Sequence, residues 1–269
     1  MKNKVIIITG ASSGIGKALA LECARRGARL SLAARDMSKL RETAAQLKES
    51  GYESLLVQTD VSIESQCKNL IDKTMETYGR IDVLINNAGI SMRAIFEEVD
   101  LDVIRKLMDT NFWGTAFCTK YAFPYLLQAK GSLVAVSSVA GFKGLPARSG
   151  YSASKYAIHG LLDVIRNETQ YQGLHVLIAC PGFTATNIRF TALSKDGSQQ
   201  GESPRDESKM VTAEETAIHI CKAIEKRKRI LVLTFQGKFI HFLNSFFPAI
   251  LDRMVFNHMA KEPNTPLKK

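Results

Sequence analysis

The chain has 269 residues, of which 45% are hydrophobic, 8% aromatic and 23% charged. These proportions are typical of a globular protein and exclude a disordered, collagen-like or disulfide-scaffold chain. The net charge is +10, and the ten Lys/Arg and three Asp/Glu between Lys222 and Lys269 supply +7 of it, so the rest of the chain offers no broad surface for nucleic acid.

Cysteine, histidine and hydropathy patterns narrow the class of protein further. The five cysteines lie far apart without a C-x-x-C pair, and the five histidines form no H-x-x-x-H pair, so we predict reduced thiols and no metal site. No apolar run approaches the roughly 18 to 20 residues of a membrane-spanning helix. The first residues do not resemble a secretory signal. We therefore expect a cytoplasmic protein, with its basic C-terminal segment as a candidate for peripheral membrane contact.

Short β-branched and leucine-rich runs alternate along the chain with longer stretches of helical period. Runs that predict strands lie at 5–8, 29–33, 54–57, 83–85, 132–136, 175–179 and 230–233. Stretches that predict helices lie at 15–26, 38–50, 64–78, 101–128, 151–171 and 213–226. Because strand and helix alternate strictly, we predict a single α/β domain with a parallel sheet covered on both faces.

A glycine-rich turn follows the first predicted strand. Residues 9–16 read TGASSGIG, and a helical stretch begins at once. The glycines let the backbone approach a pyrophosphate closely, and the helix N-terminus supplies free N–H groups and the positive end of a dipole. The spacing differs from G-x-G-x-x-G, but the physics is the same. We assign this dinucleotide contact to Gly10, Ser12, Ser13, Gly14, Ile15 and Gly16.

The end of the second predicted strand indicates which dinucleotide binds. An NAD-specific site normally places a carboxylate here for the ribose hydroxyl, but this chain has Ala34 followed by Arg35. An arginine pairs with a 2′-phosphate in bidentate fashion, so we predict NADP(H). The alternative is that Arg35 is a solvated helix-start residue and Asp36 is the ribose ligand. Asp36 is better suited to cap the helix that follows.

Several polar residues fall where a ligand crevice is expected. Tyr151 and Lys155 are four residues apart and share one face of a predicted helix. Ser138 follows a buried strand, and NNAG at 86–89 closes the fourth strand at the same edge of the sheet. Asn111 lies inside a long helical stretch. Taken singly, each has an ordinary explanation, such as a strand-end hydroxyl, a turn former or a buried helix amide.

Together these motifs resemble the short-chain dehydrogenase/reductase family over essentially the whole chain. The matching motifs, in order, are TGASSGIG at 9–16, Asp60-Val61, NNAG at 86–89, Asn111, SSVAG at 137–141, YSASK at 151–155 and PGFTAT at 181–186. The resemblance implies a Rossmann-like, doubly wound sheet of seven parallel strands in the order 3-2-1-4-5-6-7. It also implies a homodimer or homotetramer formed through the helices at 101–128 and 151–171.

The resemblance further assigns a role to each matched residue. Tyr151 would be the acid that protonates a carbonyl oxygen, with its pKa lowered by the Lys155 ammonium and the nicotinamide charge. Lys155 would also hold the nicotinamide ribose, and Ser138 would stabilise the substrate oxygen. Asn111 would anchor a water that links Lys155 to solvent. Further cofactor contacts would come from Asp60, Val61, Asn87, Ala88, Gly89, Pro181, Gly182, Thr184 and Thr186.

Two segments break the alternation of strand and helix. The polar stretch 186–210 is long for a loop and is either a substrate lid or a disordered stretch; we predict the lid, on a catalytic domain spanning 1–234. The extension 235–269 is amphipathic and basic. Its residues Phe235, Phe239, Phe242 and Phe246 share one face of a helix that Pro248 would break or kink, and the pattern resumes at 250–259.

Three interpretations of this phenylalanine face remain open. It packs on the chain's own core or on a second subunit, it forms part of a hydrophobic substrate mouth, or it lies on a membrane interface with Lys and Arg at the headgroups. The basic cluster at 226–229 favours the membrane, although a solvated helix end would also favour basic residues there.

The layout of the C-terminal part is similar to that of 11β-hydroxysteroid dehydrogenase-like, DHRS7-like and 3-ketosphinganine reductases. That resemblance implies reduction of a ketone on a lipophilic molecule. We therefore predict an NADPH-dependent enzyme of lipid metabolism that reduces a lipid- or steroid-like ketone to a secondary alcohol. The alternatives are a 3-oxoacyl-thioester (acyl-carrier-protein) reductase, which the C-terminal extension disfavours, and a non-catalytic NADP-sensing protein. Intact Asn111, Ser138, Tyr151 and Lys155 argue against the sensor.

Overall fold

Seven parallel strands form one sheet in the predicted order, β3-β2-β1-β4-β5-β6-β7. The computed structural model describes residues 1–204, 206–207 and 210–267, and only the backbone of 236, 241 and 245. The strands are β1 (Val5–Thr9), β2 (Arg29–Ala34), β3 (Ser54–Gln58), β4 (Val83–Asn86), β5 (Ser132–Val136), β6 (His175–Cys180) and β7 (Ile230–Val232). The helices are α1 (Gly14–Arg25), α2 (Met37–Glu49), α3 (Glu64–Tyr78), α4 (Leu101–Leu107), η1 (Met108–Trp113), α5 (Gly114–Gln128), η2 (Val139–Gly141), α6 (Ser149–Glu168), α7 (Ala213–Glu225), α8 (Phe235–Phe246) and α9 (Pro248–Met259).

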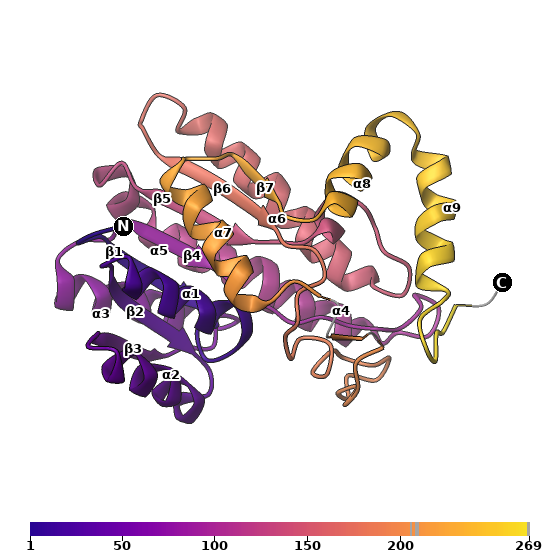
Figure 1. The fold of residues 1–269 in the computed structure, drawn as a ribbon, viewed down its shortest axis with the longest axis horizontal. Helices are drawn as coiled ribbons and strands as arrows, with labels where there is room; N and C mark the ends of the chain where they lie inside the picture. The colour runs from indigo at the N-terminus through magenta and orange to yellow at the C-terminus, as the bar shows by residue number, and fades with distance from the viewer. Residues whose placement is uncertain (205, 208–209, 268–269) are drawn as a thin grey trace.

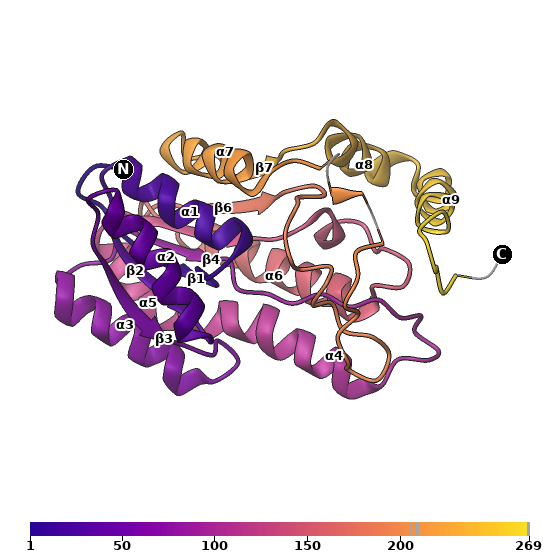
Figure 2. The same cartoon turned by 60° about the horizontal axis from the view of Figure 1, so that its bottom comes forward.

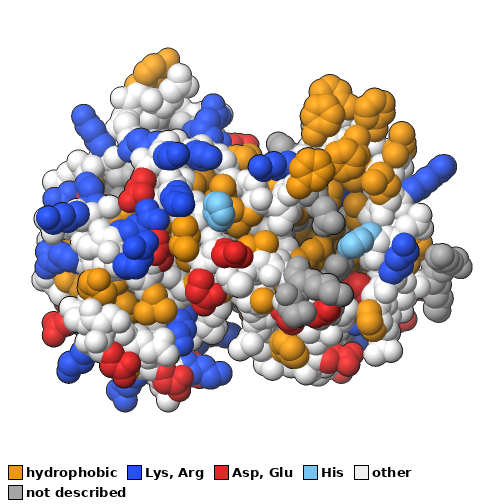
Figure 3. All heavy atoms as spheres, viewed as in Figure 1, with side chains coloured by type: hydrophobic (Ala, Val, Ile, Leu, Met, Phe, Trp, Pro, Cys, Tyr) orange, Lys and Arg blue, Asp and Glu red, His pale blue; other side chains and the backbone are white. Residues whose placement is uncertain are grey.

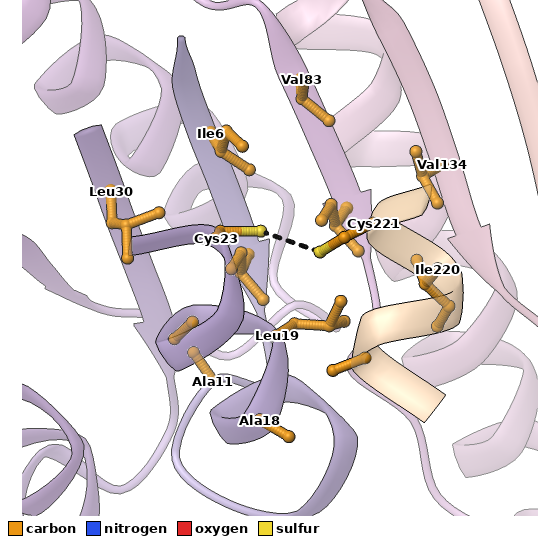
Figure 4. Packing of buried hydrophobic residues seen from close by; sticks show 14 of the residues in the cluster. Ile6, Ala11, Ala18, Leu19, Cys23, Leu30, Val83, Val134, Ile220 and Cys221 are labelled. Atoms are coloured by element: carbon orange, nitrogen blue, oxygen red, sulfur yellow. Dashed lines mark hydrogen bonds between the residues drawn. The ribbon is translucent and has the colours of Figure 1, made fainter. Parts of the chain in front are cut away.

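Helices cover both faces of the sheet, as the continuously apolar strands require. Helices α1, α2 and α7 lie on one face and α3, α5 and α6 on the other (Figure 1, Figure 2). On the first face Leu19 of α1 and Ile220 of α7 pack over Ile6 of β1 (Figure 4). Cys23 and Cys221 meet there with their sulfur atoms 3.6 Å apart. All five cysteines are buried as free thiols, in agreement with the prediction.

The predicted helix at 101–128 is one helical run with a defect in the middle. Between α4 and α5 the segment η1 is π-helical, with one extra residue in the turn. A π-helical turn is not visible in a 3.6-residue hydrophobic period, so the hydrophobic pattern did not indicate it. Asn111 lies within η1 and its side chain is fully buried. The π-helical turn therefore belongs to the part of the chain that carries a predicted site residue.

A buried carboxylate ties the start of β1 to the start of β4. Asp82 is 1% exposed and accepts hydrogen bonds from Lys4 Nζ (2.9 Å), Arg80 Nη2 (2.6 Å) and the Val5 amide (3.0 Å). Burial acts to raise the pKa of Asp82, but the bonds from Arg80 and Lys4 outweigh it and lower the pKa. The charged form of Asp82 is therefore the form that stabilises this end of the sheet.

We expect Asp82→Asn to lower the free energy of unfolding by roughly 1.5–3 kcal/mol, the range for hydrogen bonds to a charged group. Because the folded pKa lies below the unfolded value, the stabilisation is present above the unfolded pKa and is lost as pH falls through the folded one. Urea titrations at pH 7 and at pH 3 should therefore show a smaller difference between wild type and Asp82→Asn at pH 3. An equal difference at both pH values would contradict this account.

The predicted lid is joined to the rest of the chain by short β-bridges and carries an internal ion pair. Leu193 of the lid forms bridges with Met92 and Gln199, and Arg189 forms an ion pair with Glu207 (2.5 Å). Residues 205, 208 and 209 of the lid, and 268 and 269 of the extension, lie outside the described residues.

Helices α8 and α9 meet at the break that Pro248 predicts, and Pro248 is the first residue of α9. The four phenylalanines at 235, 239, 242 and 246 are all exposed, so their face does not pack on the chain's own core. Helix α8 packs instead through residues such as Ile240 and Leu243. None of the described helices combines the length and the hydropathy that a membrane crossing needs.

Candidate active site

The site is built at the carboxyl ends of the central strands, where open α/β sheets bind their ligands. After β1 the chain turns with Gly10 and Gly14 at φ +66° and +50°, values that suit glycine. A Cβ on Gly16 would lie 2.1 Å from the Gly10 carbonyl oxygen, so only glycine fits there. The Ser13 side chain makes no capping bond to the first turn of α1, which leaves those amides facing the turn. This cradle fits a pyrophosphate.

The glycine turn is fastened to the turn after β4. The Thr9 hydroxyl accepts hydrogen bonds from the amides of Asn87 and Ala88, both at 3.0 Å. The Asn87 side chain donates to the Thr9 carbonyl (2.9 Å) and to the Gly10 carbonyl (3.3 Å). Asn87 and Ala88 thus fix the shape of the glycine turn through hydrogen bonds that involve the backbone. Thr9, for which we predicted no separate role, links the two turns through its hydroxyl.

A pocket of about 500 Å³ lies beyond the end of β2. It is lined by Arg35, Gln58, Asp60, Ile63 and Gln66. The pocket therefore brings together Arg35 and Asp60, the two residues predicted at the adenosine end. Asp60 is held by hydrogen bonds from the amide and hydroxyl of Ser62 (3.0 and 2.7 Å).

Arg35, which lines this pocket, and the neighbouring Asp36 have different surroundings. Asp36 accepts from the Lys39 amide (3.1 Å), which confirms its predicted role as the cap of α2. The Arg35 side chain is exposed and makes no hydrogen bond or ion pair with the described residues. Nearby, Val61 is buried against Gly114, where a Cβ would come within 2.7 Å of it. Val61 therefore supports the floor of the site by packing.

The predicted catalytic residues converge between β4, β5 and α6. Lys155 Nζ lies 5.7 Å from the centre of the Tyr151 ring and donates to the Val136 carbonyl at 3.0 Å. Ser138 follows β5, and its hydroxyl acts to lower the pKa of Tyr151. A Cβ on Gly89 would lie 3.1 Å from Asn111 Oδ1 and 3.6 Å from Lys155 Nζ, which places these two side chains on either side of Gly89.

Asn111 is locked by three hydrogen bonds. Its Oδ1 accepts from the Ile90 amide (2.8 Å), and its Nδ2 donates to the Ile90 carbonyl (3.0 Å) and to Ser154 Oγ (2.9 Å). Ser154 donates in turn to the Tyr151 carbonyl at 2.8 Å. The π-helical turn in η1 is therefore joined to the helix that carries Tyr151 and Lys155.

The protonation of the central pair differs in part from the expectation. Burial raises the pKa of Tyr151, and the hydrogen bond with Ser138 opposes this without reversing it. The protein's own groups thus do not give the lowered tyrosine pKa that we predicted, because desolvation of the phenolate outweighs them. Burial also lowers the pKa of Lys155 to about 8. At neutral pH the phenol is protonated and the amine is mostly charged.

The segment after β6 contacts the glycine turn through Thr186. A Cβ on Gly14 would lie 3.1 Å from Thr186 Cγ2, so Thr186 closes over the turn. Gly182, after Pro181, packs against Thr234, where a Cβ would come within 2.4 Å of the Thr234 side chain. The Thr184 hydroxyl is buried and faces Gly182 O and Thr216 Oγ1, each at 3.4 Å. Thr186 is therefore the better placed of the two threonines to touch a ligand.

Two supporting residues were not singled out from the sequence. Ser154 holds Asn111, and its spacing of three residues from Tyr151 could have indicated a neighbour on the same helical turn. His159 lies one turn beyond Lys155, and its Nε2 is 2.8 Å from Ser137 Oγ. A Cβ on Gly141 would lie 2.4 Å from the same nitrogen, so His159 packs under the loop that follows Ser138. The i, i+4 spacing from Lys155 was the available signal.

The sequence matches a known protein family over most of its length. The family model of the short chain dehydrogenases matches residues 4–196. "Dehydrogenase/reductase SDR family protein 7-like" from Dictyostelium discoideum is 33% identical over 258 residues, covering 93% of this chain and 80% of that protein. "11-beta-hydroxysteroid dehydrogenase A" from Arachis hypogaea is 38% identical over 236 residues, covering 87% of this chain and 66% of that protein.

Solved structures of similar architecture contain nicotinamide dinucleotides. A short chain dehydrogenase/reductase from Burkholderia phymatum in complex with NAD has a TM-score of 0.79 and 25% identity, and the match covers 100% of this chain and 99% of that one. An alcohol dehydrogenase from Thermococcus sibiricus complexed with 5-hydroxy-NADP has a TM-score of 0.76 and 26% identity, covering 86% and 95%. One neighbour holds NAD and the other an NADP derivative, so similar folds bind both dinucleotides.

Proposed function

The chain belongs to the short-chain dehydrogenase family, and we propose that it is an NADP-dependent reductase that converts a ketone on a lipid- or steroid-like molecule to a secondary alcohol. One observation carries the proposal: Tyr151, Ser138 and Lys155 meet at the carboxyl end of β5, next to the turn that fits a dinucleotide. A protonated phenol, a hydroxyl and an ammonium at one point can supply a proton and stabilise a developing oxyanion.

The protein's own groups divide the work of such a reduction. Tyr151 holds the proton that the carbonyl oxygen takes up, and its raised pKa keeps that proton in place at neutral pH. Ser138 donates a hydrogen bond to the same oxygen. Lys155, held by the Val136 carbonyl, stabilises the phenolate that remains. When bound, NADPH supplies the hydride for the carbonyl carbon.

The assignment of NADP rests on the pocket beyond β2. Arg35 is exposed there and has no partner among the described residues, whereas Asp36 is occupied as a helix cap. A guanidinium can receive two oxygens of a 2′-phosphate at once. Gly10, Gly14 and Gly16 would hold the pyrophosphate, and Asp60 would lie beside the adenine.

An apolar wall beside Tyr151 supports a hydrophobic substrate. Tyr151 packs with Ile90, Met92 and Leu193 in a cluster that also contains Val103 and Leu107. Leu193 comes from the proposed lid (186–210), so the lid and the wall together favour a ligand with apolar surface next to the reacting carbonyl. The relative from Arachis hypogaea, which is named as a hydroxysteroid dehydrogenase, agrees with this choice.

We further propose that the chain forms a homodimer or homotetramer in the cytoplasm through α5 and α6, with the C-terminal extension left free. The outward faces of η1 and α6 carry exposed apolar side chains, among them Trp113, Tyr156 and Val164. Exposed aromatic residues gathered on neighbouring helices mark an interaction surface. Sedimentation of the full chain measures this assembly directly.

A screen of ketones with NADPH consumption as the readout tests the proposed activity. We expect steroid-like and long-chain ketones to be reduced with kcat/KM at least tenfold above that for a 3-oxoacyl thioester and for NADH in place of NADPH. A preference for the thioester would support the acyl-carrier-protein reductase instead. Tight NADPH binding without turnover on any ketone would favour the NADP-sensing protein and contradict the proposal.

A further inference from the structure

Seven large apolar side chains form one exposed surface on α8 and α9. We call it the C-terminal patch, and it consists of Phe235, Phe239, Phe242, Phe246, Phe247, Ile250 and Met254, which are between 43% and 82% exposed. In the space-filling view it appears as a raised hydrophobic area over α8 (Figure 3). Four of the rings form a single stripe along α8, and those of Phe242 and Phe246 contact each other at 5.0 Å.

The patch is displayed by helices that are fixed to the rest of the protein. The Asn244 side chain donates to the Phe142 carbonyl at 2.9 Å, and Lys143 forms an ion pair with Asp252 at 2.5 Å. The opposite side of α9 is buried through Leu251, Val255 and Met259. Both helices therefore have an inner face that packs on the chain and an outer face that the chain leaves uncovered.

The charge around the patch has one sign. Helices α8 and α9 contain Lys238, Arg253 and a single acidic residue, Asp252, which Lys143 already neutralises. Lys238 of α8 and Arg253 of α9 are exposed and have no ion-pair partner among the described residues. Aromatic rings with free cations at their margin match the chemistry of an anionic lipid surface, where rings enter the headgroup region and cations meet phosphate.

We infer that the C-terminal patch docks the protein on anionic membranes, with the stripe of phenylalanine rings entering the interface and Lys238 and Arg253 contacting lipid phosphates. This inference does not depend on the proposed function.

A second copy of the chain is a poorer partner for this surface. A two-fold symmetric dimer would place the patch against itself, because the same surface faces its own copy. That arrangement would bring Lys238 and Arg253 toward the same cations of the other copy, and the segment has no free carboxylate to compensate. An anionic lipid surface provides the missing negative charge.

Docking would also orient the substrate side of the site, a consequence that rests on the proposed function. Asn244 of α8 donates to the carbonyl of Phe142, which follows the loop after Ser138. The ring of His258 in α9 lies tilted beside that of Phe183, three residues before the lid, with ring centres 6.4 Å apart. The two docking helices thus contact two segments that lead into the site. A lipophilic ketone dissolved in the bilayer would reach the crevice from the membrane side.

Vesicle sedimentation with the full chain tests the docking. We expect the protein to bind vesicles containing about 30% phosphatidylserine, with weaker binding to pure phosphatidylcholine and at high salt, where exposed charges are screened. The triple variant Phe235→Ser, Phe242→Ser and Phe246→Ser should lower the partition coefficient at least tenfold. Lys238→Gln with Arg253→Gln should lower it several-fold on the anionic vesicles only.

The matched control is Leu101→Ser with Tyr171→Ser, which removes two exposed apolar side chains (63% and 95% exposed) that lie outside α8 and α9 and should leave binding unchanged. The single variant Phe235→Ser, at the most exposed ring of the patch, serves if the triple variant does not fold. Wild-type protein that ignores the vesicles, or a triple variant that binds like wild type, would overturn the inference. A triple variant that changes its molar mass in sedimentation but still binds vesicles like wild type would also overturn the inference, because the patch would then join copies of the chain.

Activity separates this inference from the proposed function. On a water-soluble ketone the triple variant should retain the wild-type rate, and on a ketone embedded in anionic vesicles its rate should fall at least tenfold. A result in which the triple variant loses vesicle binding while the wild-type protein reduces none of the ketones would support docking and contradict only the proposed reductase activity.

Discussion

Replacing Tyr151 by Phe should lower kcat for ketone reduction by roughly 10²- to 10⁴-fold, the range in which general acid catalysis contributes. The substitution removes one oxygen from a half-buried ring that packs with Ile90, Met92 and Leu193, so the apolar wall remains. The glycine turn and the Arg35 pocket lie elsewhere, and the Kd for NADPH should stay within about twofold of wild type. Stopped-flow hydride transfer and fluorescence titration of NADPH measure the two quantities separately.

Tyr156→Phe is the matched control, because it makes the same change on the same helix at a tyrosine that is 44% exposed and outside the site. Its kcat should equal that of wild type. Turnover by Tyr151→Phe within tenfold of wild type would refute the assignment of Tyr151 as the acid, whatever the control shows.

In the wild-type enzyme, the pH at which the reduction rate falls should be set by deprotonation of Lys155 rather than of Tyr151. Reduction requires the protonated phenol, and burial raises the pKa of Tyr151, so the phenol keeps its proton across the neutral range. The ammonium of Lys155 is lost first, since burial lowers its pKa to about 8. The reduction rate should therefore be level near pH 6 to 7 and fall as pH rises through about 8. A reduction rate that keeps rising to pH 10 would contradict the predicted fall.

The sheet could be predicted because its strands are largely apolar, and continuously apolar strands indicate burial on both faces. Runs such as Val5 to Thr9 are apolar throughout and buried throughout, which is what a strand covered on both faces needs. The strand order came from the family resemblance, and the parallel pairing that places Ser138 and Asn87 at the same edge confirmed it. The local rules and the fold agreed over this part of the chain.

The parts that could not be predicted depend on burial and on tertiary contacts. The π-helical turn around Asn111 leaves no mark on hydrophobic periodicity, and its lock onto Ser154 joins positions 43 residues apart in the chain. The raised pKa of Tyr151 follows from desolvation, which a sequence motif does not contain. The stripe on α8 had the spacing of a core face, yet its rings are exposed, because Ile240 and Leu243 on the other side of the helix make the packing contacts.

Replacing Arg35 by Ala should weaken NADPH binding by about tenfold to 100-fold and change NADH binding by less than about twofold. The size of the loss depends on which kind of interaction Arg35 makes. An ordinary exposed ion pair contributes only about 0.2–1 kcal/mol. Hydrogen bonds to a charged group contribute about 1.5–3 kcal/mol, and about 1.4 kcal/mol is a factor of ten. The bidentate geometry that a guanidinium offers to a phosphate favours the larger range.

A second substitution and a control make this prediction specific. Ala34 ends β2 at the position where an NAD-binding chain carries a carboxylate, so Ala34→Asp combined with Arg35→Ala should improve the Kd for NADH relative to Arg35→Ala alone. Lys48→Ala removes the same charge from the last turn of α2 and should leave both cofactors unaffected.

Equal losses for NADPH and NADH in Arg35→Ala would mean that the guanidinium shapes the pocket rather than reading the phosphate, and the proposal of NADP would then fail. A selective loss would establish the phosphate contact, because the two dinucleotides differ only at the 2′ position that Arg35 is proposed to contact. The exposed position of Arg35 also predicts that its contribution shrinks at high salt, since screening acts most strongly on exposed charges. The ratio of the two dissociation constants should accordingly move toward one as salt rises in wild type and stay constant in Arg35→Ala.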